Sequence, residues 1–368
     1  MVFRFLLSPC GTSLLTNGST PEQRKAITDY ANAKTNSDIL PEALSLLEDR
    51  VREVQNKLAQ ATVQEAARLS AELNGILKFY DGQWRDFQDH HCLLCTDTWL
   101  GEQTARLVES WLRQSGFSNV AVHRQTDLQT ARLSDFQLAL SDLVKWAEET
   151  IPGYRQSGYR IVFNLTGGFK SVQGFLQTLA TFYADETIYI FESATDVLRI
   201  PRLPVRMEPL AEICDRLIAF RRLAQDLPIQ PQALEGIAET LLLKLDDQVD
   251  LSPWGTLIWN QTRSELYRDR LHPAPSAKIR FSKKFEDSVQ GLPGDRLEIL
   301  NHRLDQLACH LEKPDRPNPR SLDFKPLKGN PRSPSTHEID AWSDLDAKRL
   351  FGHFEGDVFV LDELGKHL

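Results

Sequence analysis

The stretch Asn164-Leu165-Thr166-Gly167-Gly168-Phe169-Lys170-Ser171 follows an apolar run at residues 159–163, and it decides the fold. A second stretch, Ser8-Pro9-Cys10-Gly11-Thr12-Ser13, follows a similar run at residues 3–7. Each places small residues, hydroxyls and backbone N–H groups where a strand meets a helix, which is where an open α/β sheet binds anionic ligands. The pair predicts an α/β fold with a doubly wound parallel sheet and a phosphate-binding site at its strand ends.

Neither loop matches the two commonest phosphate-binding motifs. In a Walker A motif the lysine directly follows a glycine, whereas Phe169 precedes Lys170 here. The G-x-G-x-x-G dinucleotide pattern is absent from both loops. Taken alone, either loop could instead be a tight strand-to-helix turn that binds no ligand. Two such loops in one sheet favour an anion site.

The composition is that of a globular protein with ordinary hydrophobic cores. The chain has 368 residues, of which 41% are hydrophobic, and a net charge of −8, so a polyanion would need a local basic patch. Five unevenly spaced cysteines are typical of reduced thiols, and we expect a cytoplasmic protein. No segment approaches a membrane span, and the N-terminal apolar run is too short for a signal peptide.

Strands and helices alternate along the first part of the chain. The expected strands are 3–7, 92–95, 120–123, 159–163 and 187–191. A helical hairpin at about 20–80 interrupts them, with Thr20 and Thr62 as N-caps and an apolar seam along its first long helix. We predict a first domain over residues 1–205.

The rest of the chain is predicted to form two further regions that differ in secondary structure. Residues 206–275 are expected to form a helical linker, winged-helix-like, with helices at 210–223, 233–245 and from Ser252-Pro253. Residues 276–368 place a short strand and two helices before several extended runs, at 321–324, 337–341, 348–354 and 357–361. That order predicts a separate α+β domain.

One cluster has the residue types of a metal site. The run His90-His91-Cys92-Leu93-Leu94-Cys95 lies in a predicted strand, where Cys92 and Cys95 point to opposite faces. Zinc sites need a second ligand pair at a suitable spacing, and none is present. We therefore expect core thiols and no metal.

Basic residues gather in the last domain. Between residues 313 and 332 there are six basic residues against two acidic ones, and Lys348-Arg349, His337, His353 and Lys366-His367 recur on later strands, where they are expected to line one basic face. Cutting RNA without a metal needs a base, cations that hold the developing phosphorane charge, and an acid for the leaving oxygen. A solvated charged face is the alternative, because residues 278–368 hold 15 basic against 16 acidic side chains.

The segments Leu7–Asn17 and Asn164–Ser171 resemble the CRISPR-associated Rossmann-fold (CARF) sensor domain, in the subgroup whose sequences begin with an S-P-C-G-T-S-like loop. The resemblance covers about residues 1–205. It implies a Rossmann-like fold and a homodimer that binds a cyclic oligoadenylate, most commonly cyclic tetra-adenylate, made by a type III CRISPR complex. The ligand-binding residues expected on this basis are Ser8, Gly11, Thr12, Ser13, Asp97, Thr98, Asn164, Thr166, Gly167, Gly168, Lys170, Ser171 and Glu192.

The tail is similar to RelE-type toxins in its order of elements and in several short segments. By this resemblance, Lys325 and Lys328 match a Lys-x-Leu-Lys-Gly-like segment, and Arg349 matches the arginine of a Tyr-Arg-Val-like strand. Many of these toxins also use a tyrosine, but the last tyrosine here is Tyr267, upstream of the domain. His337 and His367 are the expected substitutes in proton transfer. The resemblance implies cleavage of mRNA that the ribosome positions.

These features predict a type III CRISPR ancillary effector: a metal-independent endoribonuclease, without a cofactor, that cyclic tetra-adenylate activates allosterically. Two alternatives stay open. One is a ring nuclease that degrades cyclic tetra-adenylate with Lys170 and the hydroxyl of Thr12 or Ser13. The other is a ligand-controlled DNA-binding regulator that uses Arg216, Arg221 and Arg222 of the middle helices.

Overall fold

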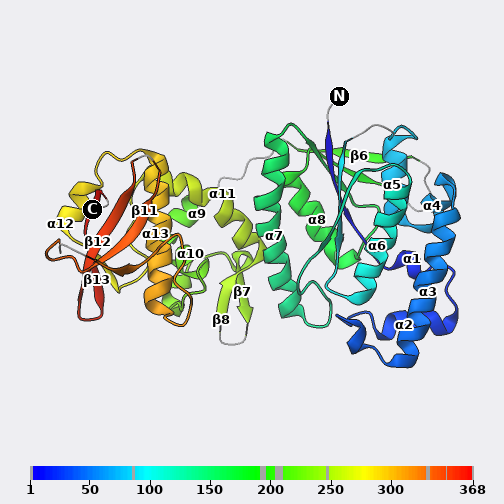
Figure 1. Cartoon of the computed structure of the whole chain (residues 1–368), viewed down its shortest axis with the longest axis horizontal. Coiled ribbons are helices and arrows are strands. Elements are labelled where there is room, and N and C mark those ends of the chain that lie inside the picture. The colour runs from blue at the N-terminus through cyan, green and yellow to red at the C-terminus, as the bar shows by residue number, and fades with distance from the viewer. Residues whose placement is uncertain are drawn as a thin grey trace. The chain divides into compact units, whose positions relative to one another are not determined.

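The computed structural model describes residues 3–84, 88–190, 196–203, 210–245, 248–328, 332–344 and 346–366. Two of the predicted site residues, Glu192 and His367, lie outside these ranges. The chain forms two compact units, Met1–Arg206 (unit 1) and Met207–Leu368 (unit 2), whose elements are labelled in Figure 1. No helix in the described ranges combines the length and the hydropathy that crossing a membrane requires.

Unit 1 is built on a six-stranded sheet with the strand order β3-β2-β1-β4-β5-β6. Its strands are β1 (Arg4–Pro9), β2 (His90–Cys95), β3 (Asn119–Arg124), β4 (Arg160–Asn164), β5 (Glu186–Tyr189) and β6 (Leu198–Pro201). The strands from β1 to β5 are parallel, which confirms the predicted parallel sheet. β6 is antiparallel to β5 and was not predicted, because it has only four residues and its apolar side chains, Leu198 and Ile200, are exposed instead of buried in a core.

Helices cover both faces of this sheet (Figure 1). α6 (Trp99–Gln114), α7 (Leu133–Gln156) and α8 (Lys170–Tyr183) follow β2, β3 and β4. Leu6 and Leu93 belong to a core that also contains residues of α6, whereas Phe5 faces the opposite side, where its ring lies 4.4 Å from that of Tyr154 on α7. The order of strands reverses between β1 and β4, which makes the carboxyl ends of these two strands a topological switch point.

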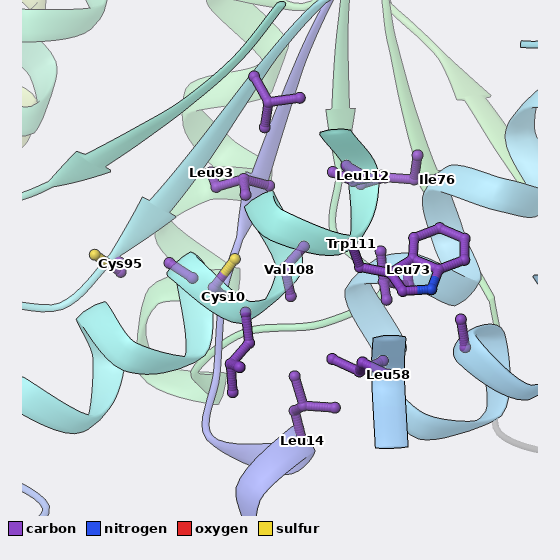
Figure 2. Packing of buried hydrophobic residues seen from close by; sticks show 14 of the residues in the cluster. Cys10, Leu14, Leu58, Leu73, Ile76, Leu93, Cys95, Val108, Trp111 and Leu112 are labelled. Carbon is purple, nitrogen blue, oxygen red and sulfur yellow. The ribbon is translucent and has the colours of Figure 1, made fainter. Parts of the chain in front are cut away.

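A helical insertion separates β1 from β2. It contains α1 (Ser13–Thr16), α2 (Pro21–Asp29), the 3₁₀ turn η1 (Asn36–Asp38), α3 (Pro41–Gln60), α4 (Val63–Leu69) and α5 (Ala71–Tyr80). The capping boxes of Thr20 and Thr62 are confirmed. The helix predicted after Thr62 is broken at Ser70, whose hydroxyl caps α5 by accepting from the N–H of Leu73. Figure 2 shows how Leu58 of α3 and Leu73 of α5 pack with Leu93 and Trp111.

Unit 2 begins with helices and a hairpin. Its first elements are α9 (Leu210–Cys214), α10 (Leu217–Leu223), the 3₁₀ turns η2 (Pro231–Leu234) and η3 (Glu239–Leu241), β7 (Leu242–Leu245), β8 (Gln248–Leu251) and α11 (Pro253–Asp269). The helix predicted over 233–245 is wrong, because this stretch forms 3₁₀ turns and the hairpin strand β7. Gly236 has φ +82°, which ends a helix, and Gly255 of α11 comes so close to Leu241 that a Cβ would lie 2.2 Å from its carbonyl oxygen.

The second half of unit 2 is a mixed sheet with two helices. It contains β9 (Ile279–Phe281), α12 (Lys283–Ser288), α13 (Gly294–Glu312), β10 (Lys325–Pro326), β11 (His337–Trp342), β12 (Lys348–Glu355) and β13 (Val358–Lys366). The strand order is β10-β11-β12-β13-β9, with β9 parallel to β13 and the other pairs antiparallel. The order of elements matches the prediction, although 321–324 forms turns and the strand begins at Lys325.

A buried ion pair joins the two halves of unit 2. Arg221 of α10 is fully buried, and its Nε lies 2.6 Å from Oδ1 of Asp305 on α13. The hydroxyl of Tyr267 donates to the other oxygen of Asp305 at 2.5 Å. Desolvation by burial raises the pKa of Asp305, and the charge of Arg221 opposes that shift.

The arginines that kept the DNA-binding alternative open are used inside unit 2. Arg222 pairs with Glu312 at 2.8 Å, and Arg216 donates to the carbonyl oxygen of Glu235 at 2.7 Å. Together with the buried Arg221, these side chains hold the fold of unit 2. The hairpin β7–β8 also precedes α11, whereas the wing of a winged helix follows its recognition helix. Within the described residues, these three arginines are therefore engaged in contacts of unit 2 itself.

Candidate functional site

The two predicted loops meet at the switch point of the sheet in unit 1. A Cβ on Gly11, after β1, would lie 3.2 Å from the backbone of Gly168, after β4. Gly168 has φ +103°, and a Cβ there would lie 2.8 Å from the ring of Pro9, so glycine is required. Asn164 also donates from Nδ2 to the hydroxyl of Ser8 at 3.2 Å. The structure thus brings Ser8, Gly11, Asn164 and Gly168 together.

A buried carboxylate, which the sequence analysis missed, completes this cluster. Glu72 lies in the first turn of α5 and is fully buried. Its Oε1 accepts the backbone N–H of Gly11 at 2.9 Å, and its Oε2 accepts the hydroxyl of Ser70 at 2.7 Å. A Cβ on Gly167 would lie 2.4 Å from the same Oε1. The Gly11 N–H, predicted to hold a ligand phosphate, therefore already holds a carboxylate of this chain.

The insertion also approaches the second loop at Gly75 of α5. We expect Gly75→Ala to lower the free energy of unfolding of unit 1 by about 1–3 kcal/mol, because overpacked side chains must shift. The added Cβ would lie 2.2 Å from Oδ1 of Asn164, and Asn164 is held in place by its bonds to Ser8 and to the carbonyl oxygen of Glu72. Urea denaturation of the full chain measures the change.

Gly174→Ala is the matched control for that prediction. Gly174 also lies within a helix, but a Cβ there would meet nothing within 4 Å. Alanine is the better helix former, so this variant is expected to gain about 0.5–1 kcal/mol. Equal changes in the two variants would mean that the close approach of α5 to the loop does not matter.

The exposed part of the site lies at the start of α8. Lys170 and Ser171 are exposed, whereas Ser8 and Asn164 are buried. α8 has no side-chain cap and no acidic residue in its first turn. In the described ranges, no acceptor binds the backbone N–H of Lys170 or Ser171. These two donors, the helix dipole and the Lys170 ammonium together favour an anion at this end.

Two hydroxyls of the loops are buried without a partner. Ser13 Oγ and Thr166 Oγ1 make no hydrogen bond to any residue that the structure describes. Thr166 Oγ1 lies beneath α5, 2.7 Å from the position of a Cβ on Gly75. Thr12 is half-buried, and its carbonyl oxygen accepts from the backbone N–H groups of Leu15 and Thr16.

Asp97 and Thr98, predicted to bind the ligand, follow β2 and have partners within unit 1. Asp97 pairs with Arg124 at 2.8 Å and with Lys34 at 3.1 Å. Hydrogen bonds from the N–H of Asp127, from Lys34 and from Arg124 keep the pKa of Asp97 low despite its partial burial. Thr98 is buried and caps α6 by accepting from the N–H of Gly101. Both residues remain predictions as ligand contacts.

The histidine and cysteine cluster of β2 lies in the cores of unit 1. Leu93 and Cys95 belong to the core in Figure 2, and strand alternation turns Cys92 to the other face. Burial raises the pKa of Cys92 and the pKa of Cys95 to about 12 each. Burial also lowers the pKa of His91 to about 3. In the part of the chain that the structure describes, no group of three or more His, Cys, Asp and Glu side chains could hold a metal ion.

In unit 2, two predicted basic residues lie on one face of the sheet. Arg349 of β12 is paired in register with Asp340 of β11, and their side chains form an ion pair. Lys325 and Arg349 share the carboxylate of Asp323, which lies 3.4 Å from Arg349 Nη1. Lys328 is exposed, two residues beyond β10. The structure therefore brings Lys325 and Arg349 together, each against a carboxylate.

His337 does not join them, because it lies on the other face of the sheet. It is in register with Gly352, and its ring stacks on Phe324 at 5.1 Å and contacts Phe354 at 5.3 Å. Partial burial lowers the pKa of His337. The aromatic packing holds the ring on the face turned toward α13, where Phe324 also contacts His310.

Comparisons with known proteins find similarity to a protein family and to solved structures. Residues 67–203 match the model of a CRISPR-associated protein family, Cas_APE2256. No curated protein matches the chain. The solved structure of Enterococcus italicus Csm6 bound to cyclic hexa-2′-fluoro-hexa-dAMP is similar at 12% identity and a TM-score of 0.29, over 85% of this chain and 64% of that protein. This chain thus spans less than two thirds of that protein's length. The residues of the family match include Glu72 and the loop after β4.

Proposed function

We propose that this chain is an ancillary effector of a type III CRISPR system, in which unit 1 binds a cyclic oligoadenylate and unit 2 cuts RNA. The observation that carries the proposal is the pair of loops at the switch point, with Lys170 and the uncapped start of α8 exposed beside them. The family match over residues 67–203 supports the CRISPR assignment.

The ligand of this proposal is cyclic tetra-adenylate, bound between two copies of unit 1. A ring with two-fold symmetry is matched by an isologous homodimer, in which both copies present the same residues. Because Glu72 holds the N–H of Gly11, the ring phosphates are assigned to Lys170, Ser171 and the backbone N–H groups at the start of α8. Thr12 contributes a hydroxyl at the edge of the same site.

Lys170→Ala is expected to weaken binding of cyclic tetra-adenylate about ten- to a hundredfold. The mutation removes a hydrogen bond between charged groups, which contributes about 1.5–3 kcal/mol. Calorimetry on the full chain measures the affinity, and the same titration should give one ring per two chains. Lys145→Ala is the control, since Lys145 is an exposed lysine of α7 that pairs with Asp142 at 3.2 Å. Equal affinities of the two variants would contradict the assignment.

In unit 2 we propose a RelE-like endoribonuclease that cleaves mRNA positioned by the ribosome. The order of elements from β9 to β13 supports this assignment, as does the placement of Lys325 and Arg349 on one sheet face. These two residues and the exposed Lys328 are assigned to the RNA phosphate. Binding of the cyclic oligoadenylate controls cleavage if the protein has a cleaving and a non-cleaving state and the cleaving state binds the ring more tightly.

One experiment tests both halves of the proposal. The full chain is incubated with end-labelled mRNA, with and without ribosomes, and with and without cyclic tetra-adenylate. We expect cleavage that requires the ring and that increases when ribosomes are present. If cyclic tetra-adenylate is degraded while the mRNA stays intact, the result would instead support the ring nuclease. No binding of any cyclic oligoadenylate and no cleavage under all four conditions would exclude the proposed function.

A further inference from the structure

His353, one of the basic residues gathered in the last domain, lies on the same sheet face as Arg349. Side chains alternate along β12, and Leu350 belongs to the core of unit 2, so Arg349 and His353 both face away from it. The two residues are four positions apart, which is about 13 Å along a strand. The two side chains therefore lie on one face of β12, with Phe351 between them.

His353 is held by a carboxylate that a β-bulge provides. In the pairing of β12 with β13, Phe351 faces Glu363 and Gly352 faces Leu361, which leaves Asp362 as the extra residue. Such bulges redirect a side chain and are frequent beside active sites. Nδ1 of His353 lies 2.9 Å and 3.1 Å from the two oxygens of Asp362. Ser335 donates its hydroxyl to Oδ2 of the same carboxylate at 2.7 Å.

The two sides of the imidazole ring have different surroundings. Asp362 and Ser335 are both buried, so the bond to Nδ1 is fixed from the interior. Nε2 lies 3.3 Å from Oε1 of Glu355, whose side chain is 52% exposed. Glu355 in turn pairs with Arg280 of β9. A substrate oxygen could therefore reach Nε2 by displacing an exposed side chain, while the other side of the ring stays in place.

We propose that His353 is the general acid of RNA cleavage and that Asp362 and Ser335 position it. This inference rests on the proposed ribonuclease function of unit 2. The 2′-oxygen forms a bond to phosphorus, the P–O5′ bond breaks, and its electron pair goes to O5′, which takes the proton from Nε2. The proton of the 2′-hydroxyl leaves to solvent water. The products are a 2′,3′-cyclic phosphate and a 5′-hydroxyl.

The electrostatics of the ring suit an acid. The hydrogen bond to Asp362 raises the pKa of His353, with a smaller contribution from Glu355. Among the residues that the structure describes, the carboxylates of Asp362 and Glu355 contact the ring, and the nearby Arg280 pairs with Glu355. The protonated form therefore persists to higher pH than in a free histidine, and the proton available for O5′ is lost as the pH rises through the raised pKa.

His353→Ala and Asp362→Asn in the full chain test the assignment, with mRNA cleavage measured under single-turnover conditions. We expect His353→Ala to lower the rate about 10²-fold, and added imidazole to restore part of it. In the wild type the rate should fall as the pH rises through the pKa of His353. Asp362→Asn removes the carboxylate, so this fall should move to lower pH, a shift that a purely structural role would not produce.

His310→Gln is the control, because His310 belongs to the same unit but contacts Phe324 on the helical side of the sheet. If the wild type cleaves RNA, and the His353 and Asp362 variants cleave it at the same rate with the same pH profile, the inference is wrong and the proposed function stands. If His353→Ala fails to fold, the pH profile of Asp362→Asn decides. A wild type that cuts no RNA under any condition overturns the proposed function itself.

Discussion

Asp305→Ala is expected to lower the free energy of unfolding of unit 2 by about 3–5 kcal/mol, because it leaves the charge of a buried arginine without its partner. Arg221 has no exposed surface, and Asp305 is also buried. The hydroxyl of Tyr267 would lose its acceptor as well. The carbonyl oxygens of Pro273 and Asn301, which also accept from Arg221, cannot neutralise the guanidinium.

Urea denaturation of the full chain measures this loss, with Asp287→Ala as the control. Asp287 pairs with Lys283 at 3.1 Å, but the two side chains are 56% and 77% exposed. Exposed pairs contribute about 0–1 kcal/mol, so the control should change little. If both variants lost the same small amount, Arg221 and Asp305 would not support each other as the structure indicates.

Arg349→Ala is expected to lower single-turnover cleavage of mRNA by about 10²–10³-fold, the scale for losing one preorganised group that stabilises the transition state. The guanidinium is held by Asp340 and Asp323 on one sheet face, with its side chain 17% exposed. These carboxylates fix the arginine before the substrate arrives. Affinity for cyclic tetra-adenylate should not change, since Lys170 and α8 belong to unit 1.

Arg349→Lys and Arg320→Ala separate this role from simple loss of charge. Lysine keeps the charge but not the planar fork of donors, so its rate should lie between those of the wild type and Arg349→Ala. Arg320 is an exposed arginine outside the sheet, and its removal should leave the rate unchanged. Thermal melts of all three variants check that unit 2 still folds. If Arg349→Ala cleaves mRNA at the wild-type rate, the assignment is wrong and the basic residues form only a solvated charged surface.

Local signals in the sequence predicted the parts of the fold that depend on neighbouring residues. The capping boxes of Thr20 and Thr62 bind residues three positions away, so their patterns are readable directly. The strand-to-helix loops after β1 and β4 were predicted from the same kind of local pattern. That the two loops lie together follows from one rule, because the carboxyl ends of parallel strands lie at the same edge of the sheet.

The errors arise where tertiary contacts decide. Glu72 is 61 residues from Gly11, and no local pattern links them. The stretch 233–245 has enough leucine for a helix, but packing of Leu241 in the core that also contains residues of α11, with Leu242 against it, selects 3₁₀ turns and a strand instead. His337 was expected beside Arg349, yet strand alternation and pairing with Gly352 put it on the other face. The role of His353 depends on a bulge that only strand pairing reveals.

The central position of β1 in the sheet also determines how unit 1 can fold during synthesis. β1 is the first strand made, but its neighbour β2 follows only at residue 90 and its other neighbour β4 only at residue 160. The apolar segment Phe5–Leu7 therefore stays unpaired until long after it has emerged. Contacts so distant in sequence make folding slow and expose the nascent chain to aggregation. The insertion, whose helices contact one another locally, is the part able to form first.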